Sequence, residues 1–180
     1  MTYLNPTCKE EYLKMLDYSI NTNKKGPIAI RTPIKGFYST GIEDITDYSI
    51  KNKFKLIHKG SKVALIGLGG FYQLATEVYE ELKSNKNIEG TLINPIFSSG
   101  LDEELLEELK KEHSLIISLE DGSLEGGFGQ RIAGFYGGSN IKVLLYGAKK
   151  EFNNCVPMDV LLTRYRLKKE LIIEDIMKSI

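Results

Sequence analysis

The stretch KVALIGLGGFYQLATEVYEEL (62–82) joins the two kinds of element that define the fold class. Its first six residues are an apolar run typical of a buried strand, and GLGG (67–70) then forms a turn. Apolar residues recur after the turn with the spacing of an amphipathic helix: Phe71, Leu74, Ala75, Val78 and Leu82. A strand followed by a helix that covers it predicts an α/β domain.

Further strands and helices alternate on both sides of this stretch. The expected strands are KLIH (55–58), GTLINPIF (90–97), HSLIISLE (113–120) and IKVLLYG (141–147), and helices are expected over 102–111 and 169–180. This alternation favours a mostly parallel sheet of about five strands with helices on both faces. Because only three residues separate 55–58 from 62–67, we expect these two strands to pair as a hairpin, which makes one strand antiparallel to the rest.

The first 53 residues follow a different pattern. Thr7 and Glu10 have the spacing of a capping box and predict the start of a helix. The apolar residues of this helix share one face: Leu13, Leu16 and Ile20. PIAIRT (27–32) is then expected as a short strand. Periodicity is lost over 36–53, which we interpret as a connector between two structural units.

The bulk composition excludes several classes of partner. Basic and acidic residues both number 24, so no cationic excess favours nucleic acid or an anionic membrane. Cys8 and Cys155 fit neither a disulfide framework nor a zinc motif. No apolar run approaches the roughly 20 residues of a membrane span, and the start lacks a signal-peptide core. We expect a soluble, cytoplasmic protein whose partners are proteins or metabolites.

Two glycine-rich motifs are candidates for function. GLGG (67–70) could hold a phosphate, but a dinucleotide fingerprint requires glycine where Tyr72 stands, so a plain turn is favoured. LEDGSLEGGFGQRI (119–132) places two acids at a strand end and glycines before a helix that begins near Phe128. Glu120 and Asp121 could form a catalytic acid–base pair, but adjacent residues of an extended chain point in opposite directions. A structural or interface role is therefore favoured for this loop, including Gly126, Gly127 and Gly129.

The histidines suggest no metal centre. His58 and His113 are the two histidines of the chain, and neither has a second ligand at metal-binding spacing. A G-x-S-x-G motif and a P-loop are also missing from the sequence. Composition and spacing alone therefore indicate only a soluble α/β domain.

Four segments together resemble transketolase-like thiamine enzymes of the 1-deoxy-D-xylulose-5-phosphate synthase family. GPIAIRTP (26–33) is similar to G-P-x-A-I-R-Y-P-R-G at the end of the family's pyrimidine-binding domain. KVALIGLGG (62–70) resembles the first core strand and turn of the C-terminal domain, and SSGLDEELLEEL (98–109) resembles its K-P-L-D-E-E-L-L helix start. LEDGSLEGGFGQRI (119–132) is similar to V-E-E-G-x-x-x-G-G-F-G-S-x-V. The resemblance covers nearly the whole chain in the same order.

The resemblance implies a fold, a domain division and a function. The fold is the transketolase C-terminal-like three-layer sandwich, an α/β architecture with a mixed sheet of about five strands, one of them antiparallel. Residues 1–40 would end the preceding pyrimidine-binding domain, 41–53 would be a linker, and 54–180 would be the C-terminal domain. Family members condense pyruvate with glyceraldehyde 3-phosphate and release carbon dioxide, using thiamine diphosphate held with magnesium. Their product feeds isoprenoid and thiamine synthesis. The chain would serve such an enzyme as an assembly domain, in a homodimer or beside a partner chain that carries the catalytic domains.

The sequence departs from the family motifs in two places, which limits the family roles that can be assigned to its residues. The diphosphate-binding G-D-G…N motif is absent, so we expect no cofactor bound by this chain alone and no catalysis by it. The second basic residue of R-Y-P-R-G aligns with Ile34, and Lys35 follows it as a candidate contact to substrate phosphate. Two alternatives stay open: the matching domain of a 2-oxoacid dehydrogenase or transketolase, and a free-standing module that binds a nucleotide or phosphorylated ligand at 67–70.

Overall fold

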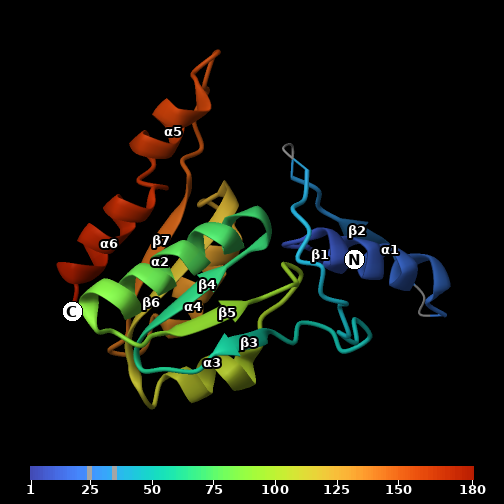
Figure 1. Ribbon diagram of the computed structural model, residues 1–180, viewed down its shortest axis with the longest axis horizontal. Coiled ribbons are helices and arrows are strands. Elements are labelled where there is room, and N and C mark those ends of the chain that lie inside the picture. Colours follow the sequence, from blue (N-terminus) through green and yellow to red (C-terminus); the bar gives the residue numbers. More distant parts are fainter. Residues whose placement is uncertain (24–25, 34–35) are drawn as a thin grey trace.

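The computed structural model describes residues 1–23, 26–33 and 36–180 and is built around a five-stranded mixed sheet (Figure 1). The strand order is β3-β5-β4-β6-β7. The strands are β3 (Lys55–His58), β4 (Lys62–Gly67), β5 (Thr91–Asn94), β6 (His113–Ser123) and β7 (Lys142–Ala148). β3 is antiparallel to β5, whereas the other neighbours are parallel. The predicted fold class and the single antiparallel strand are confirmed.

The predicted hairpin between 55–58 and 62–67 is wrong, because β3 pairs with β5 and not with β4. The chain between them crosses the start of β5, where the Gly60 amide donates to Thr91 Oγ1 at 3.0 Å and the Ser61 amide to the Glu89 carbonyl at 3.0 Å. A short connection suits a hairpin, but strand partners are chosen by the packing of both sheet faces. β3 therefore lies at the edge, next to β5.

Helices cover both faces of the sheet and complete three layers. α2 (Tyr72–Lys86) and α6 (Lys169–Met177) pack on one face. α3 (Glu103–Leu109) and α4 (Phe128–Tyr136) pack on the other. The predicted stripe of α2 is confirmed, because Ala75, Val78 and Leu82 are fully buried. Two elements lacked a signal in the sequence: the 3-10 turn Gly69–Phe71 and α5 (Met158–Arg164). The residues of α5 are all at least partly exposed.

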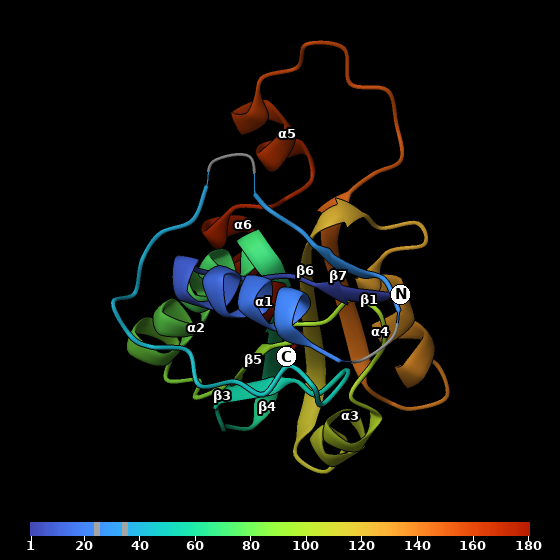
Figure 2. The ribbon, with the colours of Figure 1, turned by 90° about the vertical axis from the view of Figure 1, so that its right-hand side faces the viewer.

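We define residues 1–23 and 26–33 as the N-terminal unit, a small strand–helix–strand structure that lies beside the sheet (Figure 2). β1 (Thr2–Leu4) and β2 (Ile28–Ile30) pair in parallel, and α1 (Lys9–Asn21) lies between them in the chain. The other edge of β1 is tied to the segment after β5, since the Asn5 amide donates to the Ile96 carbonyl at 2.7 Å. A third apolar cluster joins the unit to this segment and to the connector: Leu4, Met15, Tyr48, Ile96 and Phe97.

The predicted capping box of α1 named the wrong partner for Thr7, which bonds to Glu11 and not to Glu10. The amide and the hydroxyl of Thr7 donate to Glu11 Oε2 at 2.8 and 2.9 Å, so Glu11 reaches back and Glu10 does not. Glu10 instead accepts hydrogen bonds from the connector, including the Thr40 amide at 3.0 Å. The predicted apolar face of α1 is also exposed to solvent, with Leu13, Leu16 and Ile20 at 50%, 38% and 72% exposure. Within the described part of the chain, no helix has the length and apolar character needed to cross a membrane.

Candidate functional site

The carboxyl ends of the parallel strands β4, β5 and β6 form the edge that the N-terminal unit covers. Ligand sites of open α/β sheets lie at this edge. Two polar clusters stand there: a junction centred on Glu11 and Lys55, and a glycine loop centred on Glu120. Both place carboxylates inside the protein, so their partners decide what chemistry they can perform.

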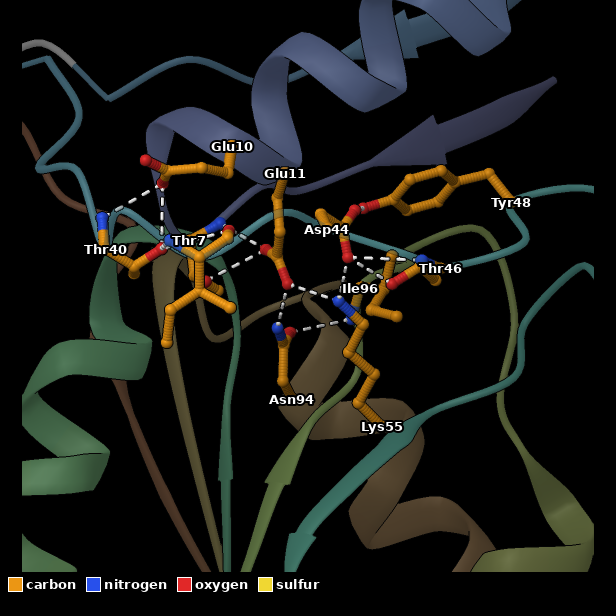
Figure 3. Close-up of polar contacts among 11 residues, drawn as sticks. Thr7, Glu10, Glu11, Thr40, Asp44, Thr46, Tyr48, Lys55, Asn94 and Ile96 are labelled. Atoms are coloured by element: carbon orange, nitrogen blue, oxygen red, sulfur yellow. Dashed lines mark hydrogen bonds and ion pairs between the residues drawn. The ribbon is translucent and has the colours of Figure 1, made fainter.

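The junction is a chain of charged side chains between α1, the connector and the sheet (Figure 3). Lys55 Nζ lies 2.8 Å from Glu11 Oε1 and 2.9 Å from Asp44 Oδ1. The Asn94 side-chain amide donates to Glu11 Oε1 at 3.0 Å, while the Asn94 side-chain oxygen accepts from the Ile96 amide at 3.1 Å. The Lys55 ammonium group thus forms ion pairs with both Glu11 and Asp44, and the Asn94 side chain orients the Glu11 carboxylate.

The electrostatics of the junction favour its charged form. Burial acts to raise the pKa of Asp44, but hydrogen bonds from Thr46, Tyr48 and Lys55 outweigh burial and lower it. Burial acts to lower the pKa of Lys55, but Glu11 and Asp44 outweigh burial and raise it. Tyr48 is buried and donates to Asp44, so its pKa is raised, first by burial and then by that hydrogen bond. The cluster holds its charges in place and leaves no free base for catalysis among these side chains.

The glycine loop surrounds the carboxylate of Glu120. Glu120 lies on β6 and accepts hydrogen bonds from the Phe128 amide at 3.0 Å and the Gly129 amide at 2.8 Å, at the start of α4. Burial raises the pKa of Glu120, and the two amides oppose that shift. A Cβ atom on Gly127 would lie 2.6 Å from Glu120 Oε1, and one on Gly129 would lie 3.1 Å from the same oxygen. The two glycines therefore leave room for this carboxylate.

The glycine loop is tied to the N-terminal unit. Arg31 Nε lies 3.1 Å from Asp121 Oδ2, and the Arg31 guanidinium also donates to the Asp121 carbonyl at 3.2 Å. On the other side of the loop, Arg131 donates to the Ser98 carbonyl, just beyond β5. The loop thus connects the end of β2 with the sheet edge.

The structure separates the predicted site residues. Glu120 turns toward α4 and Asp121 toward Arg31, so they do not form a paired acid and base. Gly126 has a positive φ of 75° and open space around it, as a turn residue does. Lys35, the candidate phosphate contact, lies outside the described residues. The junction residues escaped prediction because they come from four distant segments with no common motif.

The other motifs have structural contacts. The turn at 67–70 bonds to neighbouring backbone: the Leu68 amide donates to the Leu119 carbonyl of β6 at 2.9 Å, and the Leu68 carbonyl accepts from the Phe71 amide at 3.2 Å. His113 is buried, with Nδ1 3.0 Å from the Leu109 carbonyl and Nε2 2.8 Å from Thr91 Oγ1. His58 stacks on Tyr79 with ring centroids 4.7 Å apart.

The described residues at this edge do not fit a magnesium diphosphate. The amides at the start of α4, where a diphosphate could bind, already hold the Glu120 carboxylate. Asp121 and Glu125 add negative charge beside it, which repels a phosphate group. The glycine loop is therefore suited to packing and not to holding an anionic cofactor.

Comparisons with known proteins show the family to which the chain belongs. The family model described as transketolase, C-terminal domain, matches residues 52–171. A 1-deoxy-D-xylulose-5-phosphate synthase from Clostridium tetani is 35% identical over 180 residues, covering 99% of this chain and 28% of the synthase. One from Lachnoclostridium phytofermentans is 37% identical over 135 residues, covering 75% of this chain and 21% of that protein. The chain therefore spans under a third of the length of these curated relatives.

Solved structures share the fold. A split-gene transketolase, described as an inactive β4 tetramer, matches with a TM-score of 0.77 and 20% identity, over 99% of this chain and 57% of that one. A transketolase variant from Pichia stipitis matches with a TM-score of 0.68 and 12% identity, over 99% of this chain and 25% of the other. In both cases the match includes the N-terminal unit as well as the five-stranded sheet.

Proposed function

Since this chain belongs to the transketolase C-terminal domain family, we propose that it is the assembly domain of a thiamine-diphosphate-dependent enzyme. The enzyme is of the 1-deoxy-D-xylulose-5-phosphate synthase type, the name that the curated relatives carry. It joins pyruvate to glyceraldehyde 3-phosphate and releases carbon dioxide in the cytoplasm. Thiamine diphosphate and magnesium are held by polypeptide outside this chain, and this chain supports the catalytic domains and contributes to association between copies.

One observation carries the proposal: the described residues of the N-terminal unit form only two paired strands and one helix. Two parallel strands and one helix do not make a stable domain, and parallel strands are normally covered on both faces. The outer face of α1 exposes Leu13, Leu16 and Ile20, and the described part of β2 pairs on one edge only. We infer that the catalytic polypeptide completes this unit, with residues 1–40 as the end of its domain, 41–53 as a linker and 54–180 as the C-terminal domain.

The polar junction explains how the N-terminal unit could be held in one orientation against the C-terminal domain. Glu11 of α1 is bonded to Lys55 and Asn94 of the sheet, so the unit has one preferred position against the C-terminal domain. Charged pairs inside a protein favour one geometry over others, because any other placement leaves a charge buried without a partner. A catalytic domain that includes the N-terminal unit would therefore be held in the same orientation relative to the C-terminal domain. The junction and the Arg31–Asp121 pair are thus proposed to orient the catalytic domains.

The alternatives are less well supported. Curated relatives at 26–37% identity carry the synthase name, which favours it over a 2-oxoacid dehydrogenase or a transketolase. A free-standing phosphate-binding module would need free amides at 67–70, where the Leu68 amide bonds to the Leu119 carbonyl instead. The tetramer named for the split-gene relative supports association between copies of this chain.

Calorimetry with thiamine diphosphate and magnesium tests the proposal. The chain alone should release no binding heat, because Glu120 occupies the amides at the start of α4. The chain mixed with the polypeptide that carries the G-D-G…N motif should bind the cofactor with one site per pair. Stoichiometric binding by the chain alone at micromolar concentration would contradict the assembly role.

A further inference from the structure

A segment at the end of β7 projects from the body of the molecule (Figures 1 and 2). We name residues 149–157, between β7 and α5, the arm. It begins with the exposed Lys149 and Lys150, which make no ion pair within the described part of the chain. Phe152 follows and is 100% exposed. The arm therefore presents an aromatic ring and two ammonium groups together on an exposed segment.

The arm is held in one conformation on both sides of Phe152. The Tyr165 hydroxyl donates to Glu151 at 2.6 Å, and the Asn153 side-chain amide donates to the Tyr165 hydroxyl at 2.8 Å. Arg164 donates to Asn153 Oδ1 at 3.1 Å and lies 3.3 Å from Glu151 Oε1. These contacts fix the neighbours of Phe152 while its ring points into solvent. Such preorganisation lowers the entropy cost of binding.

A groove of matching chemistry lies along α2. Its walls include the rings of Tyr38 and Tyr72, and burial raises the pKa of Tyr72 to about 12. The carboxylates of Glu77 and Glu80 lie on its rim, exposed and without an ion-pair partner among the described residues. Lys169 also lines the groove, but its Nζ lies 3.8 Å from Glu81 Oε2, so the negative charges of Glu77 and Glu80 remain in excess. The groove therefore combines aromatic residues with an acidic rim, and it suits a ligand that is both cationic and aromatic.

We propose that the arm of one copy docks in the α2 groove of a second copy, with Phe152 between Tyr38 and Tyr72 and with Lys149 and Lys150 beside the two glutamates. The chain itself carries the basic and aromatic segment that the groove would select, and a net charge of zero allows copies to approach. The hydrogen bonds of Glu151 and Asn153 to Tyr165 and Arg164 hold the arm at the end of α5, and in Figure 1 the arm extends away from its own α2, so the contact forms between copies. Two reciprocal contacts close a two-fold dimer.

This inference rests on the association between copies in the proposed function, and it names the surface responsible. Sedimentation of the full chain over a concentration series tests it. Phe152→Ser should weaken dimerisation about thirtyfold, the typical loss of a buried aromatic anchor. Ile45→Ser, which replaces another exposed apolar residue (90% exposed) outside the arm and the groove, should leave dimerisation unchanged. A parent chain that stays monomeric up to roughly 1 mM would overturn the proposal.

Charge reversal identifies the two surfaces as partners. Glu77→Lys with Glu80→Lys should weaken dimerisation, and Lys149→Glu with Lys150→Glu should do the same. Joining all four substitutions in one chain should restore it, which also excludes misfolding as the cause of the losses. Failure of the fourfold variant to dimerise while it keeps its circular dichroism would overturn the arm–groove contact. The assembly role would survive that result, because the cofactor calorimetry with the catalytic polypeptide tests it separately.

Discussion

Lys55 Nζ lies 2.8 Å from Glu11 Oε1, so the first residue of β3 binds a carboxylate of α1 inside the molecule. The Glu11 side chain is only 7% exposed and that of Lys55 is 26% exposed. Burying such a pair gains little net stability, but removing one member is costly because the other loses its partner. The pair therefore sets the position of the N-terminal unit more than it strengthens the fold.

Replacing Glu11 should release the N-terminal unit. Glu11→Ala removes acceptors from Thr7, Lys55 and Asn94, and we expect a loss of about 3 kcal/mol in the free energy of unfolding. Hydrogen exchange should accelerate in α1 and β1 before it does in β4 or β6. Lys14→Ala, an exposed site on the same helix, is the matched control and should change neither measurement. Equal exchange in the two variants would show that the junction does not hold the unit.

Acid should loosen the junction through Asp44. The pKa of Asp44 is lower in the folded than in the unfolded protein, although burial opposes the shift, because Thr46, Tyr48 and Lys55 bond to the ionised form. The stability from this group is fully present above the ordinary aspartate pKa and is lost as pH falls through the folded value. Asp44→Asn should therefore show a flatter loss of stability than the parent as the pH falls below the ordinary aspartate pKa of about 4. Parallel curves in chemical denaturation would contradict this role.

The glycine loop should tolerate no side chain at position 127. A Cβ atom there would lie 2.6 Å from Glu120 Oε1 and closer still to the Ser123 carbonyl, which is backbone and cannot turn away. We expect Gly127→Ala to destabilise the protein by about 1–3 kcal/mol in denaturant unfolding. Gly134→Ala in α4 has open space and should stabilise by about 0.5–1 kcal/mol. If both alanine variants melt above the parent, the loop is not packed as described.

Glu120→Gln should keep the fold at a small cost. Glutamine retains one oxygen for the Phe128 or Gly129 amide but turns its NH₂ group toward the other. We expect a loss of about 1–2 kcal/mol at neutral pH, with a single cooperative unfolding transition. An unchanged midpoint of denaturation would show that the carboxylate does not bind the two amides.

Local patterns predicted the parts of the fold whose partners are close in sequence. The spacing of Ala75, Val78 and Leu82 was enough for α2, because a helix face depends only on its own residues. The partner of β3 was not predictable from a three-residue connection, since β5 comes more than thirty positions later. The prediction of one antiparallel strand was confirmed even though its pairing was wrong.

The candidate site was predictable only where it lies in one stretch. The spacing from Glu120 to Gly129 indicated a packed loop, and the structure shows the carboxylate that the glycines enclose. Glu11, Asp44, Lys55 and Asn94 stand far apart in the chain, and each alone looks like an ordinary polar residue. The docking of the N-terminal unit brings Glu11 to Lys55 and Asn94, and the fold of the connector brings Asp44 to Lys55.

Reconstitution of activity from separate polypeptides tests the assembly role of this chain. The chain would be mixed with the polypeptide that carries the G-D-G…N motif, and carbon dioxide release from pyruvate and glyceraldehyde 3-phosphate would be measured with thiamine diphosphate and magnesium. We expect no carbon dioxide release by either polypeptide alone and release by the mixture. A mixture that contains the Glu11→Ala variant should release less carbon dioxide than one that contains the Lys14→Ala variant. Release by the chain alone, or a catalytic polypeptide that is fully active without it, would contradict the account.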